Sequence, residues 1–202
     1  MPGTRVLVLF AHPAPRRSRV QQRLAAAVRA LDGVTFHDLY AAYPDFDVDV
    51  AHEQALLVAH DIVVLQHPFY WYSTPAILKQ WQDVVLEHGW AYGREGNALR
   101  GKMLLSVIST GGLESAYCRE GGNRYTVGEL LSPLAQTAFL CGMDYLPPFV
   151  VHGTHAMTDD EMDAAAADYA MIVAALRDGR LDLAAARARG RLNADVSALC
   201  GG

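Results

Sequence analysis

Cysteine is scarce in this sequence, because Cys118, Cys141 and Cys200 are the only three among 202 residues. Three scattered cysteines cannot form the disulfide framework of a small secreted protein, and they lack the paired spacing of a zinc site. The sequence also has no run of the roughly 18 consecutive apolar residues that a membrane-spanning helix needs. These absences predict a protein of the reducing cytoplasm that is not itself embedded in a membrane.

Positive charge is in the minority. Seventeen lysines and arginines stand against 22 aspartates and glutamates, which gives a net charge of −5, and no basic block stands out. Nucleic acids and anionic lipid surfaces attract proteins through clustered positive charge. We therefore expect small molecules or other proteins as partners, and no nucleic acid.

Several familiar binding and catalytic motifs are absent as well. The complete phosphate-binding loop Gly-x-x-x-x-Gly-Lys-Ser/Thr and the dinucleotide fingerprint Gly-x-Gly-x-x-Gly do not occur, which disfavours ATP binding and a classical nicotinamide domain. The nucleophile elbow Gly-x-Ser-x-Gly of serine hydrolases is missing too. His152 and His155 come nearest to a metal motif, but they lack acidic or cysteine partners at ligand spacing, so no metal is expected.

What the chain does contain is a regular alternation of apolar strands with amphipathic helices. The expected strands cover residues 5–11, 34–39, 61–66, 102–109 and 144–152. The expected helices begin near Ser18, cover 51–59, run from Thr74-Pro75 towards Gly89, precede Gly142, and follow Thr158. The helix before Gly142 starts either at Thr126, with a kink at Pro133, or afresh at Ser132. Ser18 with Gln21, and Thr158 with Glu161, are predicted capping boxes, and the prolines of the last strand place it at an edge.

Five parallel strands need helical crossovers, so the pattern predicts an α/β fold with helices on both faces of the sheet. The natural arrangement is a flavodoxin-like, doubly wound, five-stranded parallel sheet in the order 2-1-3-4-5. We expect one domain over residues 1–177, followed by a tail over 178–202 that forms a loose helix or a contact between subunits. Ligands of such sheets bind beyond the carboxyl ends of the strands, at the switch point between strands 1 and 3.

The loop after the first strand, from His12 to Gln21, leads directly into a helix. The free N–H groups of a helix N-terminus attract anions, and Ser18 adds a hydroxyl there. Arg16, Arg17 and Arg19 add positive charge nearby. This loop predicts a phosphate site, although Ser18 as a plain helix cap with solvated arginines explains the same residues.

The loops after the third and fourth strands suit a flat ring. Residues 69–72 are four consecutive aromatics that no core periodicity explains, and residues 109–112 end in two glycines that permit close backbone approach. Together, the three loops predict a site for a mononucleotide with a planar ring. A phosphoacceptor receiver domain shares the topology but needs carboxylates where this chain has His12 and His67.

Several of these segments resemble one known family. They are Ala11-His12-Pro13, Gln66 through Trp81, His88 through Gly93, and Ser109-Thr110-Gly111-Gly112, with Tyr43 through Phe46 and Leu146 through Phe149 in support. In them the chain is similar to the flavodoxin-like NAD(P)H:quinone oxidoreductases, and among these to the KefF-type ancillary proteins of glutathione-gated potassium efflux systems. The resemblance extends from about residue 5 to about residue 175.

The resemblance implies a non-covalently bound flavin, FMN in preference to FAD, in a homodimer whose active sites lie at the subunit interface. The positions implied to hold the flavin phosphate are His12, Ser18, Arg19, Val20 and Gln21. Those implied to hold the edge of the ring are Phe69, Tyr70, Trp71 and Tyr72. Those implied to close over its other side are Ser109, Thr110, Gly111 and Gly112.

The resemblance also implies an activity, namely two-electron transfer from NAD(P)H through the flavin to a quinone. Tyr117 matches a tyrosine that assists hydride transfer in the family, and Asn123 stands where the family has a histidine. The alternative function is that of a regulatory ancillary subunit of a potassium efflux transporter, which uses the flavin site as a sensor. Such a subunit would lie in the cytoplasm at the inner face of the membrane, held there by its partner.

Overall fold

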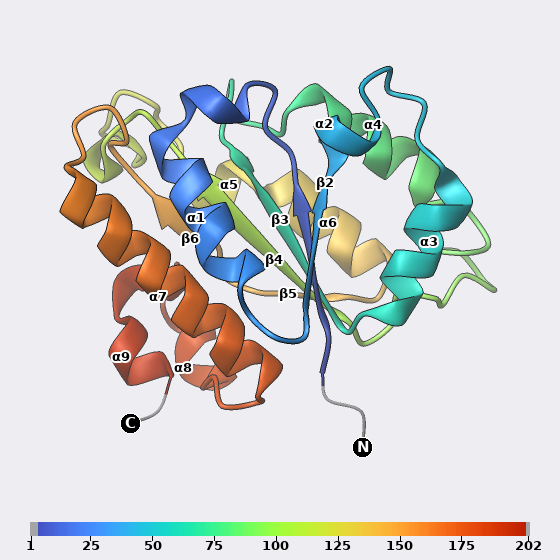
Figure 1. Cartoon of the computed structure of the whole chain (residues 1–202). Coiled ribbons are helices and arrows are strands. Elements are labelled where there is room, and N and C mark those ends of the chain that lie inside the picture. The colour runs from blue at the N-terminus through green and yellow to red at the C-terminus, as the bar shows by residue number, and fades with distance from the viewer. Residues whose placement is uncertain (1–3, 201–202) are drawn as a thin grey trace.

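A parallel sheet runs through the computed structural model, which describes residues 4–200, and helices cover both of its faces (Figure 1). The described strands are β1 (Val6–Phe10), β2 (Val34–Asp38), β3 (Ile62–Pro68), β4 (Met103–Ser109), β5 (Asp144–Tyr145) and β6 (Phe149–Val151). Their order is β2-β1-β3-β4-β5, with β6 also paired to β4, and every pairing is parallel. The predicted flavodoxin-like order 2-1-3-4-5 is confirmed. Residues 1–3 and 201–202, which the expected domain and tail include, lie outside the described part.

The fifth strand differs from the prediction of one continuous strand over residues 144–152. It consists of β5 and β6, which pair with opposite ends of β4 and are separated by Leu146, Pro147 and Pro148. Proline lacks the N–H group that a sheet ladder needs, so the two consecutive prolines interrupt the pairing. The predicted edge position is correct.

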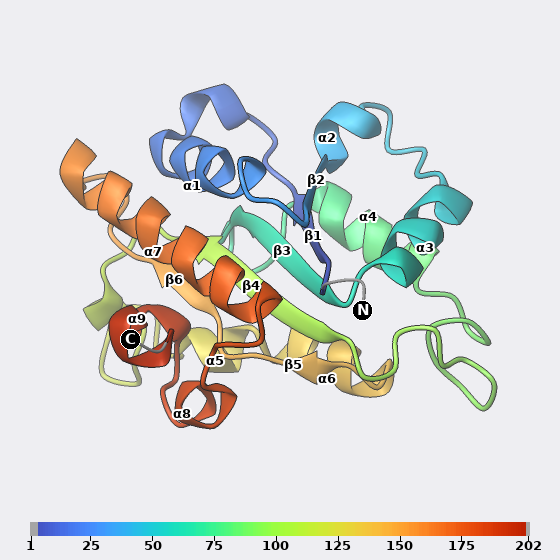
Figure 2. The same cartoon turned by 60° about the horizontal axis from the view of Figure 1, so that its bottom comes forward.

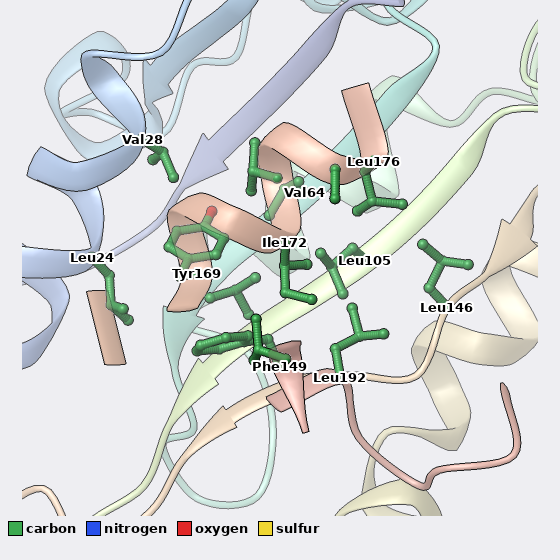
Figure 3. Packing of buried hydrophobic residues seen from close by; sticks show 14 of the residues in the cluster. Leu24, Val28, Val64, Leu105, Leu146, Phe149, Tyr169, Ile172, Leu176 and Leu192 are labelled. Atoms are coloured by element: carbon green, nitrogen blue, oxygen red, sulfur yellow. The ribbon is translucent and has the colours of Figure 1, made fainter. Parts of the chain in front are cut away.

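One face of the sheet is covered by α1 (Arg19–Arg29) and α7 (Asp159–Arg177). Apolar side chains of α1 recur at helical spacing, and Figure 3 shows two of them, Leu24 and Val28, beside the residues of α7. Tyr169 and Ile172 of α7 pack there against the sheet. The helix α7 begins with the predicted capping box, because Thr158 accepts the N–H of Glu161, whose side chain returns the bond.

The other face carries the remaining helices of the first three quarters of the chain. They are α2 (Leu39–Ala42), α3 (Val50–Ala59), α4 (Ala76–Val85), α5 (Val127–Leu130) and α6 (Ser132–Leu140). The predicted α4 is present, but it begins one residue later than expected, because Pro75 is the N-cap with an extended ψ of 152° and not the first helical residue, and it ends at Val85, before Gly89. The helix expected before Gly142 is two helices, and each of the two alternative starts is used. A capping box at Thr126 begins α5, and α6 begins at Ser132 with Pro133 in its first turn.

The C-terminal segment packs against the body of the protein. Its helix α9 (Val196–Leu199) lies beside α7, α8 (Leu183–Arg187) packs against α9 (Figure 2), and Leu192 is fully buried in the same core. The side chain of Asn193 accepts the N–H of Val150 at 3.1 Å and donates to its carbonyl at 2.8 Å. Asn193 therefore satisfies part of the free edge of β6. No helix within residues 4–200 combines the length and the apolarity needed to cross a bilayer.

Candidate functional site

The loops that follow β1, β3 and β4 enclose a cavity of about 450 Å³ at the carboxyl-end edge of the sheet, towards the top of Figure 1. We call it the first cavity. It lies at the predicted place, because the strand order switches between β1 and β3. Its lining includes eight predicted site residues, namely His12, Ser18, Arg19, Val20, Phe69, Tyr70, Ser109 and Gly111. Three segments far apart in the sequence are thus brought together.

One end of the first cavity has the chemistry of an anion site. The side chain of Ser18 accepts the N–H of Gln21 at 3.2 Å and so begins α1, whose N-terminal dipole favours negative charge. His12 accepts the N–H of Ala14 through Nδ1 at 3.0 Å. Burial lowers the pKa of His12, against the opposing charge of Asp38, so its ring is neutral at pH 7. A neutral ring that accepts through Nδ1 carries its proton on Nε2, which makes Nε2 a hydrogen-bond donor.

The arginines near this end divide into two groups. Arg17 lines the first cavity, as predicted for a residue that adds positive charge there. Arg19 also lines it, but its guanidinium binds Asp159 at the start of α7 at 2.8 Å. Arg23 binds Asp163 at 2.7 Å. Arg19 and Arg23 therefore form ion pairs that join α1 to α7, so part of the expected positive charge is neutralised.

Gln21, predicted as a phosphate residue, points away from the first cavity. Its Nε2 donates to the carbonyl of His67 at 3.1 Å and to Ser109 Oγ at 2.9 Å. Its Oε1 accepts a bond from Gln66 at 3.0 Å, and Gln66 in turn accepts one from Tyr169 of α7. The predicted return bond from Gln21 to Ser18 is absent, because these buried polar groups of the sheet take its side chain. Gln21 thus connects α1 to the strands below the cavity.

The aromatic segment after β3 is split between cavity and surface. Phe69 and Tyr70 line the first cavity, and the Tyr70 ring meets the ring of His12 edge to face at 5.9 Å. Trp71 and Tyr72 adopt left-handed backbone angles, with φ of 49° and 64°, which turn their side chains outward. Trp71 is 92% exposed as a residue. Backbone strain of this kind is costly for aromatic residues and is typical of functional loops.

The glycine-rich loop after β4 is shaped by residues that sequence reasoning did not select. A Cβ atom on Gly111 would lie 2.5 Å from Nε2 of His155, so a larger residue there would push the His155 ring aside. Thr154 and His155 line the first cavity, together with Ala14 and Pro68. Thr110 is buried and donates to the carbonyl of Gly112 at 2.8 Å, so both residues shape the loop without lining the cavity. No sequence signal pointed to Thr154 and His155, because they follow the edge strand and reach the site only through folding.

The two predicted catalytic residues lie beside the first cavity, and neither lines it. The ring of Tyr117 stands between those of Phe69, at 6.5 Å, and His152, at 5.4 Å. Asn123 accepts a hydrogen bond from the hydroxyl of Tyr72 at 3.1 Å. Asn123 therefore fixes the outward part of the aromatic segment.

One group of three metal-ligating side chains comes together within residues 4–200, and it does not include His152 or His155. It consists of His37, His52 and Glu53. The carboxylate of Glu53 is fully buried and accepts bonds from His37, Tyr43 and Trp81 at 2.6 to 2.8 Å. With three donors, its hydrogen-bonding capacity is largely filled, which makes this group a structural network that joins β2, α2, α3 and α4.

The residues of the first cavity fit FMN. Its volume lies within the roughly 300 to 1,000 Å³ of small-molecule sites. The helix N-terminus, Ser18 and the Nε2 of His12 suit a phosphate, while Tyr70 and the bare backbone of Gly111 suit a planar ring. The two ends of the cavity differ in chemistry, which matches a molecule with a charged phosphate at one end and a planar ring at the other.

Comparison with known proteins agrees with this geometry. The flavodoxin-like fold family matches residues 4–173. Among curated proteins, the chain is 44% identical over 164 residues to the glutathione-regulated potassium-efflux system ancillary protein KefF of Enterobacter sp. strain 638, a match that covers 81% of this chain and 92% of that protein.

Solved structures give the same result. The general stress protein 14 of Treponema denticola, solved in complex with FMN, superimposes with a TM-score of 0.82 at 41% identity and covers 85% of this chain and 99% of its own. The NADPH-quinone reductase from P. pentosaceus gives a TM-score of 0.77 at 35% identity, with 84% and 97% coverage.

Proposed function

Because the chain belongs to the flavodoxin-like fold family, we propose that it is an FMN-dependent NAD(P)H:quinone oxidoreductase. The observation that carries this proposal is the first cavity, where an anion site and a platform for a planar ring face one space. Likeness to an FMN complex and to an NADPH-quinone reductase supports the choice of cofactor and reaction.

Within this proposal, residues at the two ends of the first cavity bind the two parts of the cofactor. Ser18, the Nε2 of His12 and the start of α1 bind the phosphate, while Arg17 supplies positive charge. Tyr70 and the backbone at Gly111 hold the ring system. Bound FMN supplies the redox chemistry, in which NAD(P)H, a proton and a quinone become NAD(P)⁺ and a hydroquinone.

Tyr117 has the position for contact with the quinone. Its ring lies at the edge of the first cavity against Phe69, and its hydroxyl is 3.6 Å from the position of a Cβ on Gly112. A phenolic O–H there can donate a hydrogen bond to a quinone oxygen. Asn123 acts as a positioning residue, since it holds Tyr72 on the rim.

Two measurements test this function. The purified protein is first titrated with FMN and with FAD, and we expect FMN to bind more tightly and with a flavin absorption band. Oxidation of NADH and of NADPH is then followed with 1,4-benzoquinone, and we expect turnover that requires FMN. A protein that binds neither flavin, or one that binds FMN but does not oxidise either nucleotide, contradicts the proposal.

A second function is favoured by one observation, the 44% identity to a potassium-efflux ancillary protein across 92% of its length. In this role the protein would remain in the cytoplasm and dock on the inner face of an efflux transporter. Co-purification with the transporter encoded nearest to it, with FMN present and absent, tests the docking. Absence of the complex under both conditions contradicts this role and leaves the reductase unaffected.

The proposed assembly is a homodimer with the sites at the interface. Large apolar side chains are exposed on the segments after β3 and β4, where Trp71, Leu113 and Tyr125 are each more than half exposed. A second copy that covers this rim would bury them and shield the first cavity from water.

A further inference from the structure

A second cavity, of about 560 Å³, opens on the far side of Tyr117 from the first one. Four segments build it: the turn η2 (Glu114–Ala116) with Tyr117, the start of α5, the strand β6, and residues of the C-terminal segment. The family match ends at residue 173, so the wall that Arg189 and Arg191 supply comes from outside the family's common part.

The C-terminal wall is held firmly in place. Leu192 donates its N–H to the carbonyl of Pro148 at 2.9 Å, and Asn193 makes two bonds to Val150 of β6. The buried side chains of Leu192 and Val196 anchor the same segment in the core. The backbone that carries Arg189 and Arg191 is therefore held in place beside the second cavity.

The walls of the second cavity are mostly apolar and include one aromatic ring. Val127, Pro148 and Val150 line it with the face of Tyr117. His152 also lines it, and burial lowers the pKa of that imidazole, so the ring is neutral at pH 7. Flat apolar walls with an aromatic ring and a neutral imidazole suit a planar aromatic molecule.

Arg189 and Arg191 both line the second cavity, and each has an acidic partner. Arg191 binds Glu114 through Nη1 at 2.5 Å, and Arg189 lies 3.6 Å from the carboxylate of Asp195. Glu114 is 64% exposed, so its pair with Arg191 is screened by water and holds weakly. A guanidinium has five N–H donors, so each arginine can bind a second acidic group beside its present partner.

The two cavities share Tyr117 and its turn as a partition. On one side the Tyr117 ring meets Phe69, which lines the first cavity, and on the other it meets His152, which lines the second. Thr110, next to Gly111 of the first cavity, bonds to His152 at 3.1 Å. A molecule in the second cavity would therefore be separated by Tyr117 from the site that we assign to the flavin ring.

We propose that the second cavity binds a planar aromatic molecule that carries an acidic group, with Arg189 and Arg191 as the residues that select for that group. This inference goes beyond the proposed function, because Tyr117 stands between the second cavity and the site assigned to the flavin ring. The aromatic part lies along the apolar wall beside Tyr117, and the acidic group contacts the guanidiniums of Arg189 and Arg191.

Two matched compounds test the selection. Anthraquinone-2-sulfonate carries an acidic group, and 2-(hydroxymethyl)anthraquinone is its neutral counterpart. Calorimetric titration of the FMN-loaded protein, without NAD(P)H, gives the dissociation constant of each. We expect the sulfonate to bind about tenfold more tightly than the neutral compound, because charge-assisted hydrogen bonds add to ring packing.

Variants then assign the selection to the arginines. Arg191→Gln and Arg189→Gln should each remove most of the tenfold ratio, and Arg191→Lys should restore part of it. Arg94→Gln removes the same charge from an exposed loop that does not line the second cavity, and the ratio should persist. The melting temperature of every variant is measured as well. A variant that loses the ratio but keeps the melting temperature has lost binding contacts, whereas a lower melting temperature indicates a destabilised C-terminal segment.

Each outcome decides the question. Equal affinity for the two compounds, or a ratio that both glutamine variants retain, overturns the proposal. A ratio that Arg94→Gln abolishes as fully as Arg191→Gln overturns it too, since it reports only net charge. Selective sulfonate binding by a protein that fails to bind FMN would refute the proposed reductase function while it supports this site.

Discussion

Glu53 shows at the scale of one residue how a charge is kept inside this protein. Burial raises the pKa of its carboxyl, but hydrogen bonds from His37, Tyr43 and Trp81 outweigh burial and leave the pKa below its ordinary value. The ionised form is thus the stable one in the folded chain. A buried carboxylate costs free energy unless donors surround it, and here three donors from different elements do so.

This lowered pKa gives a pH dependence with a definite sign. Since folding lowers the pKa of Glu53, its ionised form contributes stability above the unfolded-state pKa, and this contribution is lost as the pH falls through the folded-state pKa. Glu53→Gln should lower the free energy of unfolding at pH 7 by about 2 to 3 kcal/mol, because the amide cannot accept all three bonds. Urea denaturation at pH 7 and at pH 4 measures both effects. The substitution should matter less at pH 4, and an equal loss at both pH values contradicts this explanation.

Gly111 supplies a test of the first cavity at the same scale. Gly111→Ala should weaken FMN binding by about tenfold or more, because the new Cβ displaces the ring of His155 from the cavity wall. The measurement is fluorescence titration with FMN. Gly122→Ala is the matched control, since a Cβ at Gly122 meets no atom within 4 Å. Unchanged affinity in the Gly111 variant would show that the loop does not approach the cofactor.

At the scale of elements, the side chain of Asn193 takes the place of a neighbouring strand at the free edge of β6. The consecutive prolines interrupt the fifth strand, and Asn193 bonds the N–H and the carbonyl of Val150 in β6. An exposed strand edge invites pairing with other chains, and the C-terminal segment covers part of this one. The same contact holds the arginine wall of the second cavity.

Loss of that contact should therefore have a local effect. Asn193→Ala removes two hydrogen bonds and should lower the free energy of unfolding by about 1 to 2 kcal/mol. Hydrogen exchange at the amide of Val150 should accelerate more than exchange at β3, which lies in the middle of the sheet. Equal acceleration at both strands would mean that Asn193 stabilises the whole fold and not the edge.

At the scale of the whole molecule, the rim of the first cavity is the surface that a second copy would cover. Trp71 is 92% exposed in the single chain, so its substitution removes few contacts within that chain. Trp71→Ser should shift the protein from dimer to monomer in light scattering without a loss of melting temperature in the monomer. Phe139 on α6 is 77% exposed, and Phe139→Ser is the control that should leave the dimer intact. A Trp71→Ser protein that remains a dimer contradicts the proposed interface.

The sequence by itself determined the layers of the molecule and the position of the site. Alternating apolar strands and amphipathic helices can form one buried sheet only with helical crossovers, and the handedness of those crossovers restricts the strand order. The carboxyl-end loops then meet at one edge, which is why His12, Ser18, Tyr70 and Gly111 could be placed together from local pattern and resemblance. The capping box at Thr158 could also be predicted from the sequence, since its two partners, Thr158 and Glu161, lie within four residues.

The tertiary structure decided everything that depends on partners far apart in the chain. The side chain of Gln21 points away from the cavity because it forms hydrogen bonds with the buried side chains of Gln66 and Ser109. His155 lines the cavity and Arg191 pairs with Glu114, although these partners are too far apart in the sequence for a local pattern to predict the contacts. Hydrophobic periodicity specifies which face of an element is buried, whereas the identity of its neighbours is fixed only when the whole chain packs.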